Sequence, residues 1–245
     1  MTRVRLIMLS MLAAFAVSAV VSSSASAALK KCTATEQGGD NTWCIETSAG
    51  VNQELSDLGG TEAFTSKGGA SSITNAGITI ECKKETDKGN LIQEDSVEPK
   101  NSGVSILFKE CSVKNNPKCV VRNQPLNKIG ELEVGPLTSG VVKIGTKWYD
   151  KFQSPGGTFI TIEVLNKGTE NCLIKNTYAV TGEACGELST SETLTKVQTL
   201  TFSKAVEEAC GTELKLKGVK SVFTDTKEVE LSGVNAGKPW GLAES

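Results

Sequence analysis

The alternation of apolar and polar residues is the feature that most constrains the fold of this chain. In "GITIEC", Ile78, Ile80 and Cys82 fall on one face of a strand, and Thr79 and Glu81 fall on the other. Polar residues at the alternate positions indicate that one sheet face packs while the other meets water, as in antiparallel sheets. The same period of two recurs at Val104/Ile106/Phe108, Leu132/Val134, Ile160/Ile162/Val164, Leu214/Leu216 and Val229/Leu231.

Turn sequences rich in glycine, asparagine and proline separate these segments at short intervals. Short strands with frequent turns predict an all-β fold, either an antiparallel β-sandwich or a closed β-barrel of about ten or more short strands. We expect a single all-β domain over 63–245, preceded by a loop-rich segment over 28–62 with room for a short helix near 52–58. The turn sequences are "DKGN" (87–90), "NNP" (115–117), "SPGG" (154–157), "NKGTE" (166–170) and "NAGKP" (235–239).

Residues 1–27 have the order of a secretory signal peptide. Two arginines precede an uncharged run over 6–21, which is shorter than the roughly 20 apolar residues of a membrane-spanning helix. Ala25 and Ala27 supply the small side chains expected before a cleavage site. The chain is therefore predicted to be secreted and extracellular, with no integral membrane segment after cleavage.

All eight cysteines follow that segment, and an even number in a secreted chain predicts a disulfide framework. The chain has no C-x-x-C pair and no histidine, so zinc ligation is not expected. Lipid attachment at Cys32 is not expected either, because Lys31 occupies the position before it. The predicted pairs are Cys32–Cys44, Cys82–Cys172, Cys111–Cys119 and Cys185–Cys210, of which Cys82–Cys172 is the pair that remains after the local ones.

The lack of histidine excludes several classes of enzyme, namely those with Ser-His-Asp, Cys-His or H-E-x-x-H sites. Arg122 is the one arginine after residue 27, so nucleic acid is not an expected partner. "GVNAGKP" is one residue short of a P-loop and lacks Ser or Thr after Lys238, which favours a turn. The sequence predicts no catalytic residue, no cofactor and no metal site.

Carboxylates are the remaining groups that could support catalysis. A glycoside hydrolase needs two carboxyls about 5–9 Å apart, and an alternating strand pattern does not establish such a pair. Solvated positions on strand faces are the simpler interpretation of Glu81, Glu110, Asp150 and Glu163. Asp87, Asn90, Glu94 and Asp95 carry calcium-compatible oxygens without EF-hand spacing, so a hairpin turn is the favoured interpretation there.

Three aromatic side chains are candidates for stacking on a ligand such as a sugar ring. Trp148 and Tyr149 are adjacent in "KWYDKF", so in a strand they point to opposite faces and one of them could be exposed. Trp240, in "GKPWG", either stacks on a ligand or plugs the mouth of a barrel or sandwich. Trp43 is expected to pack on the disulfide formed by its neighbour Cys44.

Several stretches together resemble a family of uncharacterised secreted proteins from soil-dwelling Gram-positive bacteria. The resemblance covers most of residues 63–241 and implies secretion, a β-rich fold and paired cysteines. The family has no assigned activity, so it implies no catalytic residue. The stretches are "FTSKGGASSIT", "GITIECK", "SILFKECSV", "GELEVGPLTSG", "TGEACGEL", "LTFSK" and "LSGVNAGKPWG".

Secretion, a disulfide-stapled β fold and the lack of a recognisable catalytic set favour a non-catalytic extracellular or cell-wall-associated protein, structural or binding. The alternative is a carbohydrate-binding module or a carboxylate-dependent glycoside hydrolase, with cell-wall or extracellular polysaccharide as its partner. A third class is a protease inhibitor that presents a rigid loop such as "KNNPKC" (114–119). The sequence names no ligand.

Overall fold

The all-β prediction is confirmed by the computed structural model, which describes residues 41–48, 51–55, 58–75, 77–93, 99–124, 126–189 and 194–244. These residues belong to one compact unit, Lys31–Ser245. The strands are β1 (Asn41–Ser48), β2 (Val51–Glu54), β3 (Thr61–Gly68), β4 (Ser71–Thr74), β5 (Thr79–Cys82), β6 (Lys84–Ile92), β7 (Lys100–Lys109), β8 (Ser112–Val113), β9 (Cys119–Asn123), β10 (Glu131–Ile144), β11 (Lys147–Gln153), β12 (Thr158–Asn166), β13 (Asn176–Gly182), β14 (Ala184–Leu188), β15 (Val197–Phe202), β16 (Leu214–Leu216), β17 (Val219–Leu231) and β18 (Trp240–Glu244).

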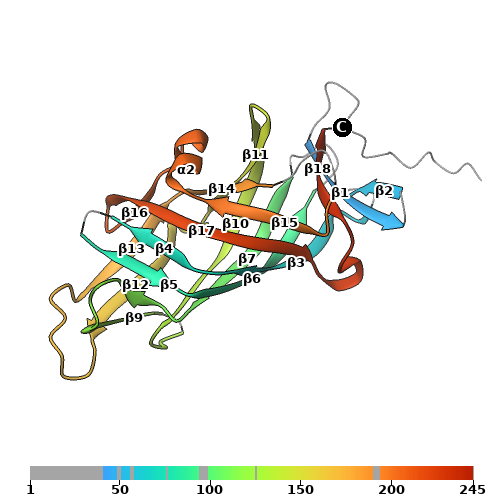
Figure 1. Ribbon diagram of the computed structural model, residues 1–245. Helices are drawn as coiled ribbons and strands as arrows, with labels where there is room; N and C mark the ends of the chain where they lie inside the picture. Colours follow the sequence, from blue (N-terminus) through green and yellow to red (C-terminus); the bar gives the residue numbers. More distant parts are fainter. Residues whose placement is uncertain are drawn as a thin grey trace, which may run out of the picture. The chain divides into compact units, whose positions relative to one another are not determined.

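Eight antiparallel strands close into a barrel, which settles the choice between barrel and sandwich (Figure 1). Their order is β15, β14, β11, β10, β7, β6, β3 and β17, and β15 pairs back onto β17. The closing register runs from Val197 opposite Glu230 to Phe202 opposite Asp225. Closure gives these strands a partner on each side, which removes the free edges of an open sheet.

The apolar faces predicted from alternation form the core. All of the residues in the predicted faces over 78–82, 104–108, 132–134, 160–164, 214–216 and 229–231 are buried in one continuous apolar cluster. Burial of these faces is the main favourable contribution to folding, because about 25 cal/mol is gained per Å² of apolar surface removed from water.

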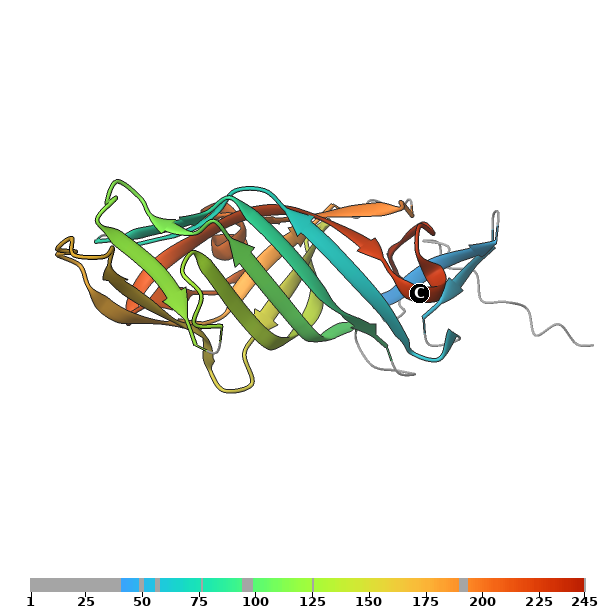
Figure 2. The same cartoon turned by 90° about the horizontal axis from the view of Figure 1, so that it is seen from below.

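The long strand β17 links the barrel to a second set of strands. Its second half pairs with β15 and β3 in the barrel, and its first half pairs with β16 and β4. The second set continues through β13, β12 and β9 on one side and through β5 and β8 on the other. Seen from below, the gold β12–β13 hairpin and the blue β1–β2 hairpin lie at opposite ends of the barrel (Figure 2).

A three-stranded sheet of β18, β1 and β2 lies at the end of the barrel opposite the β12–β13 hairpin (Figure 2). The prediction of a loop-rich 28–62 segment was wrong for β1 and β2, and β2 occupies the start of the helix predicted near 52–58. Trp43 packs on Trp240 with ring centres 5.6 Å apart, and both side chains are buried. Both rings line a small cavity together with barrel side chains such as Leu188 and Leu200, a position that agrees with the closing role predicted for Trp240. The predicted signal peptide and Cys32 lie outside the described residues.

The turn predicted at "DKGN" was wrong, because β6 runs through it without interruption. Asp87 and Gly89 point into the barrel, and Gly89 lies opposite Phe64 of β3. A Cβ atom at Gly89 would lie 2.7 Å from the Phe64 ring, so glycine is needed here for close packing rather than for a turn. The other four turn sequences do fall between strands.

Every described cysteine, Cys44 included, is disulfide-bonded. The bridge from Cys185 to Cys210 matches its predicted pair. It ties β14 to the helix α2 (Lys204–Cys210), which packs with Tyr149 on the outside of the barrel. Among the described residues, no helix combines the length and apolar character needed to cross a membrane.

Two predicted bridges were wrong: Cys82 pairs with Cys111 rather than Cys172, and Cys119 pairs with Cys172 rather than Cys111. Pairing between β6 and β7 brings together the segments just before β6 and just after β7, where Cys82 and Cys111 lie. Pairing of β9 with β12 places Cys119 opposite Asn166, whose side chain accepts a hydrogen bond from the backbone of Cys172. Strand pairing, not proximity in sequence, selects these partners.

Candidate functional site

An apolar cavity of about 90 Å³ lies where the barrel meets the second set of strands. Its wall combines barrel side chains such as Phe108 and Phe152 with second-set side chains such as Ile162 and Val180. Phe159 and Phe223 also line the cavity and are only half-buried, so the wall is thin on their side. The polar side chains in the wall are Ser71, Ser72 and Lys227.

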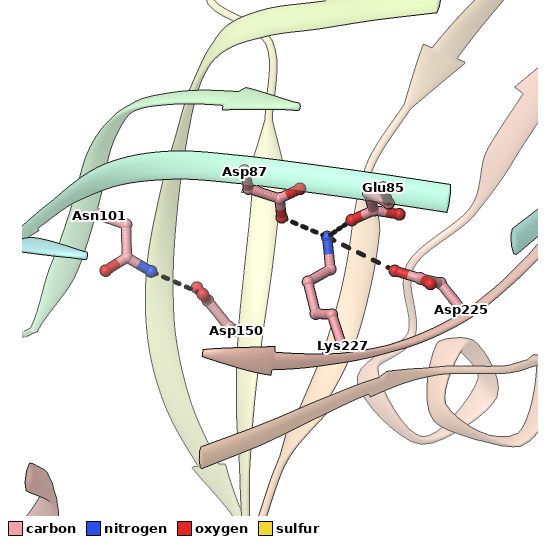
Figure 3. A network of polar contacts seen from close by, with 6 residues as sticks. All are labelled: Glu85, Asp87, Asn101, Asp150, Asp225 and Lys227. Atoms are coloured by element: carbon pink, nitrogen blue, oxygen red, sulfur yellow. Dashed lines mark hydrogen bonds and ion pairs between the residues drawn. The ribbon is translucent and has the colours of Figure 1, made fainter. Parts of the chain in front are cut away.

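Lys227 belongs to a buried ionic cluster inside the barrel, drawn in Figure 3. Its ammonium donates hydrogen bonds to Glu85 Oε1 and to Asp87 Oδ2, the latter at 2.6 Å, and Asp225 Oδ2 lies 3.5 Å away. The ammonium also lies 5.3 Å from the centre of the Phe202 ring. No side chain of the four is more than 4% exposed, so water contributes little to solvating their charges.

Strand register explains how these side chains meet. Lys227 of β17 lies opposite Gly68 of β3, and Gly68 lies opposite Glu85 of β6. Gly68 has no side chain, and a Cβ atom there would lie 3.2 Å from Glu85 Cβ and 3.3 Å from Asp225 Oδ1. Asp225 and Asp87 lie two residues from Lys227 and Glu85 along the same strands, so they share the inward face. One glycine thus leaves the space in which the cluster forms.

The cluster holds more acid than base, and burial raises the pKa of Glu85 and of Asp225. Burial is the main cause for Glu85, and repulsion from Asp87 and Asp225 adds to it, which brings the Glu85 pKa to about 9 despite attraction from Lys227. Burial also raises the pKa of Asp225. Burial alone would lower the pKa of Lys227, but the three acids outweigh it and raise that pKa. Glu85 is therefore protonated at neutral pH.

Hydrogen bonding leads to the same conclusion about protons. Glu85 Oε2, Asp87 Oδ1 and both carboxyl oxygens of Asp225 are buried acceptors without a hydrogen-bond donor. A protonated Glu85 is a donor, and the carboxyls of Asp87 and Asp225 are within its hydrogen-bonding reach. Among the described residues, no group of three or more acids, cysteines or histidines has the arrangement of a metal site.

Asp150 lies beside this cluster, and the prediction that it is a solvated strand-face residue was wrong. Its side chain is buried inside the barrel and accepts a hydrogen bond of 2.6 Å from Asn101 Nδ2. The same amide donates to Ser139 Oγ at 2.9 Å. Burial raises the Asp150 pKa from 3.8 to about 7, although hydrogen bonds from Ser139 and Asn101 and the charge of Lys227 oppose the rise.

Changing Asp150 to asparagine should therefore stabilise the protein above pH 7. The folded state keeps the Asp150 proton between about pH 4 and 7 while the unfolded state loses it, so wild-type stability falls over that range. A pKa raised from 3.8 to about 7 corresponds to a penalty of up to about 4 kcal/mol on the charged form. Urea unfolding of both proteins at pH 4 and pH 8.5 measures the difference.

The variant Glu230→Gln is a matched control, because Glu230 is exposed on the outside of the barrel. It should follow the wild-type pH dependence. If Asp150→Asn and wild type differ by the same amount at both pH values, Asp150 does not titrate in the folded state as described.

The three aromatic candidates for ligand stacking are all buried, so the prediction that they present a ring to a ligand was wrong. Trp148 faces the core, Tyr149 packs under α2 beside the Cys185–Cys210 bridge, and Trp240 packs on Trp43. Trp148 and Tyr149 do point to opposite faces, but α2 covers the outer one. A sugar ring needs an open aromatic face, which none of the three offers.

The other candidate carboxylates are dispersed in separate ion pairs. Glu110 contacts Lys84 at 2.6 Å, Glu81 contacts Lys114 at 3.6 Å, and Glu163 accepts a hydrogen bond from Arg122 at 2.6 Å. Exposed pairs of this kind contribute little to stability. Among the candidate acids Asp87, Asp150, Glu81, Glu110 and Glu163, the structure brings only Asp87 and Asp150 to the site.

Sequence reasoning missed Lys227, Glu85 and Asp225. A signal was present in the alternation pattern: Asp225 and Lys227 fall on the same inward-facing positions of the strand as Val229 and Leu231.

Comparison with known proteins finds no matching family model, no matching curated protein and no matching solved structure.

Proposed function

We propose that this is a secreted, non-catalytic binding protein whose barrel takes a small apolar molecule, or the end of an apolar chain, into the cavity beside Lys227. The observation that carries the proposal is the apolar wall of that cavity, with Lys227 as its one charged group. An apolar pocket with few polar groups and acids of perturbed pKa beside it is the usual place to expect a ligand. Three disulfides fit an extracellular protein.

The volume of the cavity limits the occupant. Ordinary small-molecule sites measure about 300–1,000 Å³, whereas this cavity measures about 90 Å³. An engineered apolar cavity of about 150 Å³ stays dry and binds benzene or xenon. The ligand is therefore a molecule of very few carbon atoms, or one terminal group of a larger molecule. Carbohydrate binding through Trp148, Tyr149 and Trp240 has no support, because all three rings are buried.

Filling the cavity should abolish binding. Ala184 lines the cavity wall, and the variant Ala184→Leu adds side-chain volume into it. Xenon and benzene are suitable probes, with binding followed by xenon NMR and by the rise in melting temperature that a ligand specific to the folded state produces. We expect wild type to show one saturable site and Ala184→Leu to show none.

The matched control is Ala209→Leu, the same substitution on the exposed face of α2. It should bind the probes as wild type does. Far-UV circular dichroism must show that both variants keep the all-β fold, since overpacking a core costs about 1–3 kcal/mol. Wild type without saturable binding, or Ala184→Leu with unchanged binding, would contradict the proposal.

A further inference from the structure

We infer that Lys227 and Glu85 are joined by an intramolecular amide bond, which ties β17 to β6 across β3 inside the barrel. The two side chains contact each other through Lys227 Nζ and Glu85 Oε1, and both are almost completely buried. Gly68 of β3 lies between them in the register, opposite Lys227 on one side and opposite Glu85 on the other. Because Gly68 has no side chain, the space between the two side chains is open. This inference goes beyond ligand binding and does not depend on it.

The contact has the geometry that such a bond requires. Lys227 Nζ is in hydrogen-bond contact with Glu85 Oε1, one bond away from the carboxyl carbon that the amine attacks, and near-attack conformers hold their reacting atoms about 3–3.5 Å apart. The side chains are held there by the fixed register of three paired strands. The reaction is thus intramolecular and its groups are already oriented, so it avoids a large part of the entropic barrier of a bimolecular condensation.

The neighbouring acids supply proton transfer. An amine attacks a neutral carboxylic acid far more readily than a carboxylate, and the raised pKa keeps Glu85 in its neutral acid form. Because the three acids raise the pKa of Lys227, its amine has to be freed by a base in direct contact, and Asp87 Oδ2 lies 2.6 Å from Nζ, within the range for direct proton transfer. Asp225 lies farther away, at 3.5 Å, without a hydrogen bond to Nζ. Glu85 is therefore the electrophile, and Asp87 is the base.

The step balances without any further reactant. The Asp87 carboxylate takes a proton from the Lys227 ammonium, and the freed lone pair of Nζ attacks the Glu85 carboxyl carbon. The C=O electron pair moves onto oxygen, and the protonated Asp87 donates its proton to the departing hydroxyl. The C=O bond re-forms as the C–OH bond breaks, and the Asp87 carboxylate takes the second proton from nitrogen. The products are one amide bond, one water molecule and a protonated Asp87, with no change in oxidation state.

Peptide mapping of the reduced, denatured wild-type protein tests this inference directly. Trypsin cleaves after Lys84 and Lys88 and releases 85–88, but it does not cleave after an acylated Lys227 or before Pro239. We expect a branched species that joins 85–88 to 221–245 and weighs one water molecule less than its two parts. Fragmentation should place the link at Glu85. Full release of 85–88, 221–227 and 228–245 as separate, unmodified peptides would overturn the inference.

Two variants separate the bond from its catalysis. Lys227→Arg keeps the positive charge but should form no link. Asp87→Asn keeps the Lys227 amine and Glu85 but removes the base, so the rate of linking should fall by about 10²-fold or more. Far-UV circular dichroism and intact disulfides report folding of each variant. A link at Asp87 or Asp225 in wild type would refute Glu85 as the electrophile, and wild-type linking in Asp87→Asn would refute Asp87 as the base.

Discussion

Replacing Lys227 by methionine is expected to lower the free energy of unfolding by at least about 3–5 kcal/mol, the usual cost of removing one partner of a buried ion pair, with loss of the amide link adding to it. Methionine has a similar volume, so the cavity it leaves is small. The variant loses the one cation among the described residues that contacts Glu85, Asp87 and Asp225 before linking, and it also loses the amide link to Glu85. Since a typical domain is stable by about 5–15 kcal/mol, the loss is a large fraction of the total. Urea unfolding at pH 7 measures it.

Two further variants show whether the cost arises from uncompensated buried charge. In the fourfold variant Lys227→Met, Glu85→Gln, Asp87→Asn and Asp225→Asn, the acids become neutral, so the part of the loss caused by uncompensated buried charge should return, whereas the part caused by loss of the amide link should not. Lys147→Met removes a lysine whose partner Glu187 lies 2.8 Å away on the surface, and it should have little effect. Equal losses of unfolding free energy from Lys227→Met and Lys147→Met would show that the buried cluster contributes no more to stability than an exposed ion pair.

Replacing both Cys119 and Cys172 by alanine should lower the free energy of unfolding by about 4 kcal/mol. Their bridge spans 53 residues, and the chain-entropy model assigns about that value to a loop of this length. The bridge also fastens β9, which pairs only with β12 among the described residues. Denaturant unfolding of the double variant under non-reducing conditions measures the effect.

The Cys185–Cys210 bridge provides the matched comparison, because it spans only 25 residues. Its double alanine variant should lose about 3.5 kcal/mol in the same model. A smaller loss for Cys119–Cys172 than for Cys185–Cys210 would mean that contacts around the bridges, rather than the lengths of the closed loops, set their contributions.

Local pattern was sufficient for the segments with clear alternation and for their buried faces, but it missed β1, β2 and the course of β6 through "DKGN". Ile106, Phe108, Ile162 and Val164 were assigned to the core because a period of two is visible within a few residues and needs no knowledge of the partner strand. The same reasoning identified the all-β class, and order along the chain identified the bridge between Cys185 and Cys210. It could not choose between barrel and sandwich, because closure depends on β15 meeting β17, which follows from the curvature of the whole sheet.

The candidate site depends on contacts between distant strands, so it was beyond the reach of the sequence alone. Charged residues at 85, 87, 225 and 227 are typical of a wet strand face, and only the register through Gly68 shows that they meet inside the barrel. The exchange of partners among Cys82, Cys111, Cys119 and Cys172 has the same origin. The sequence by itself determined the strands with clear alternation and which of their apolar faces are buried, because alternation is a local property. The tertiary structure alone decided which strands pair, and with them which buried charges and cysteines come together.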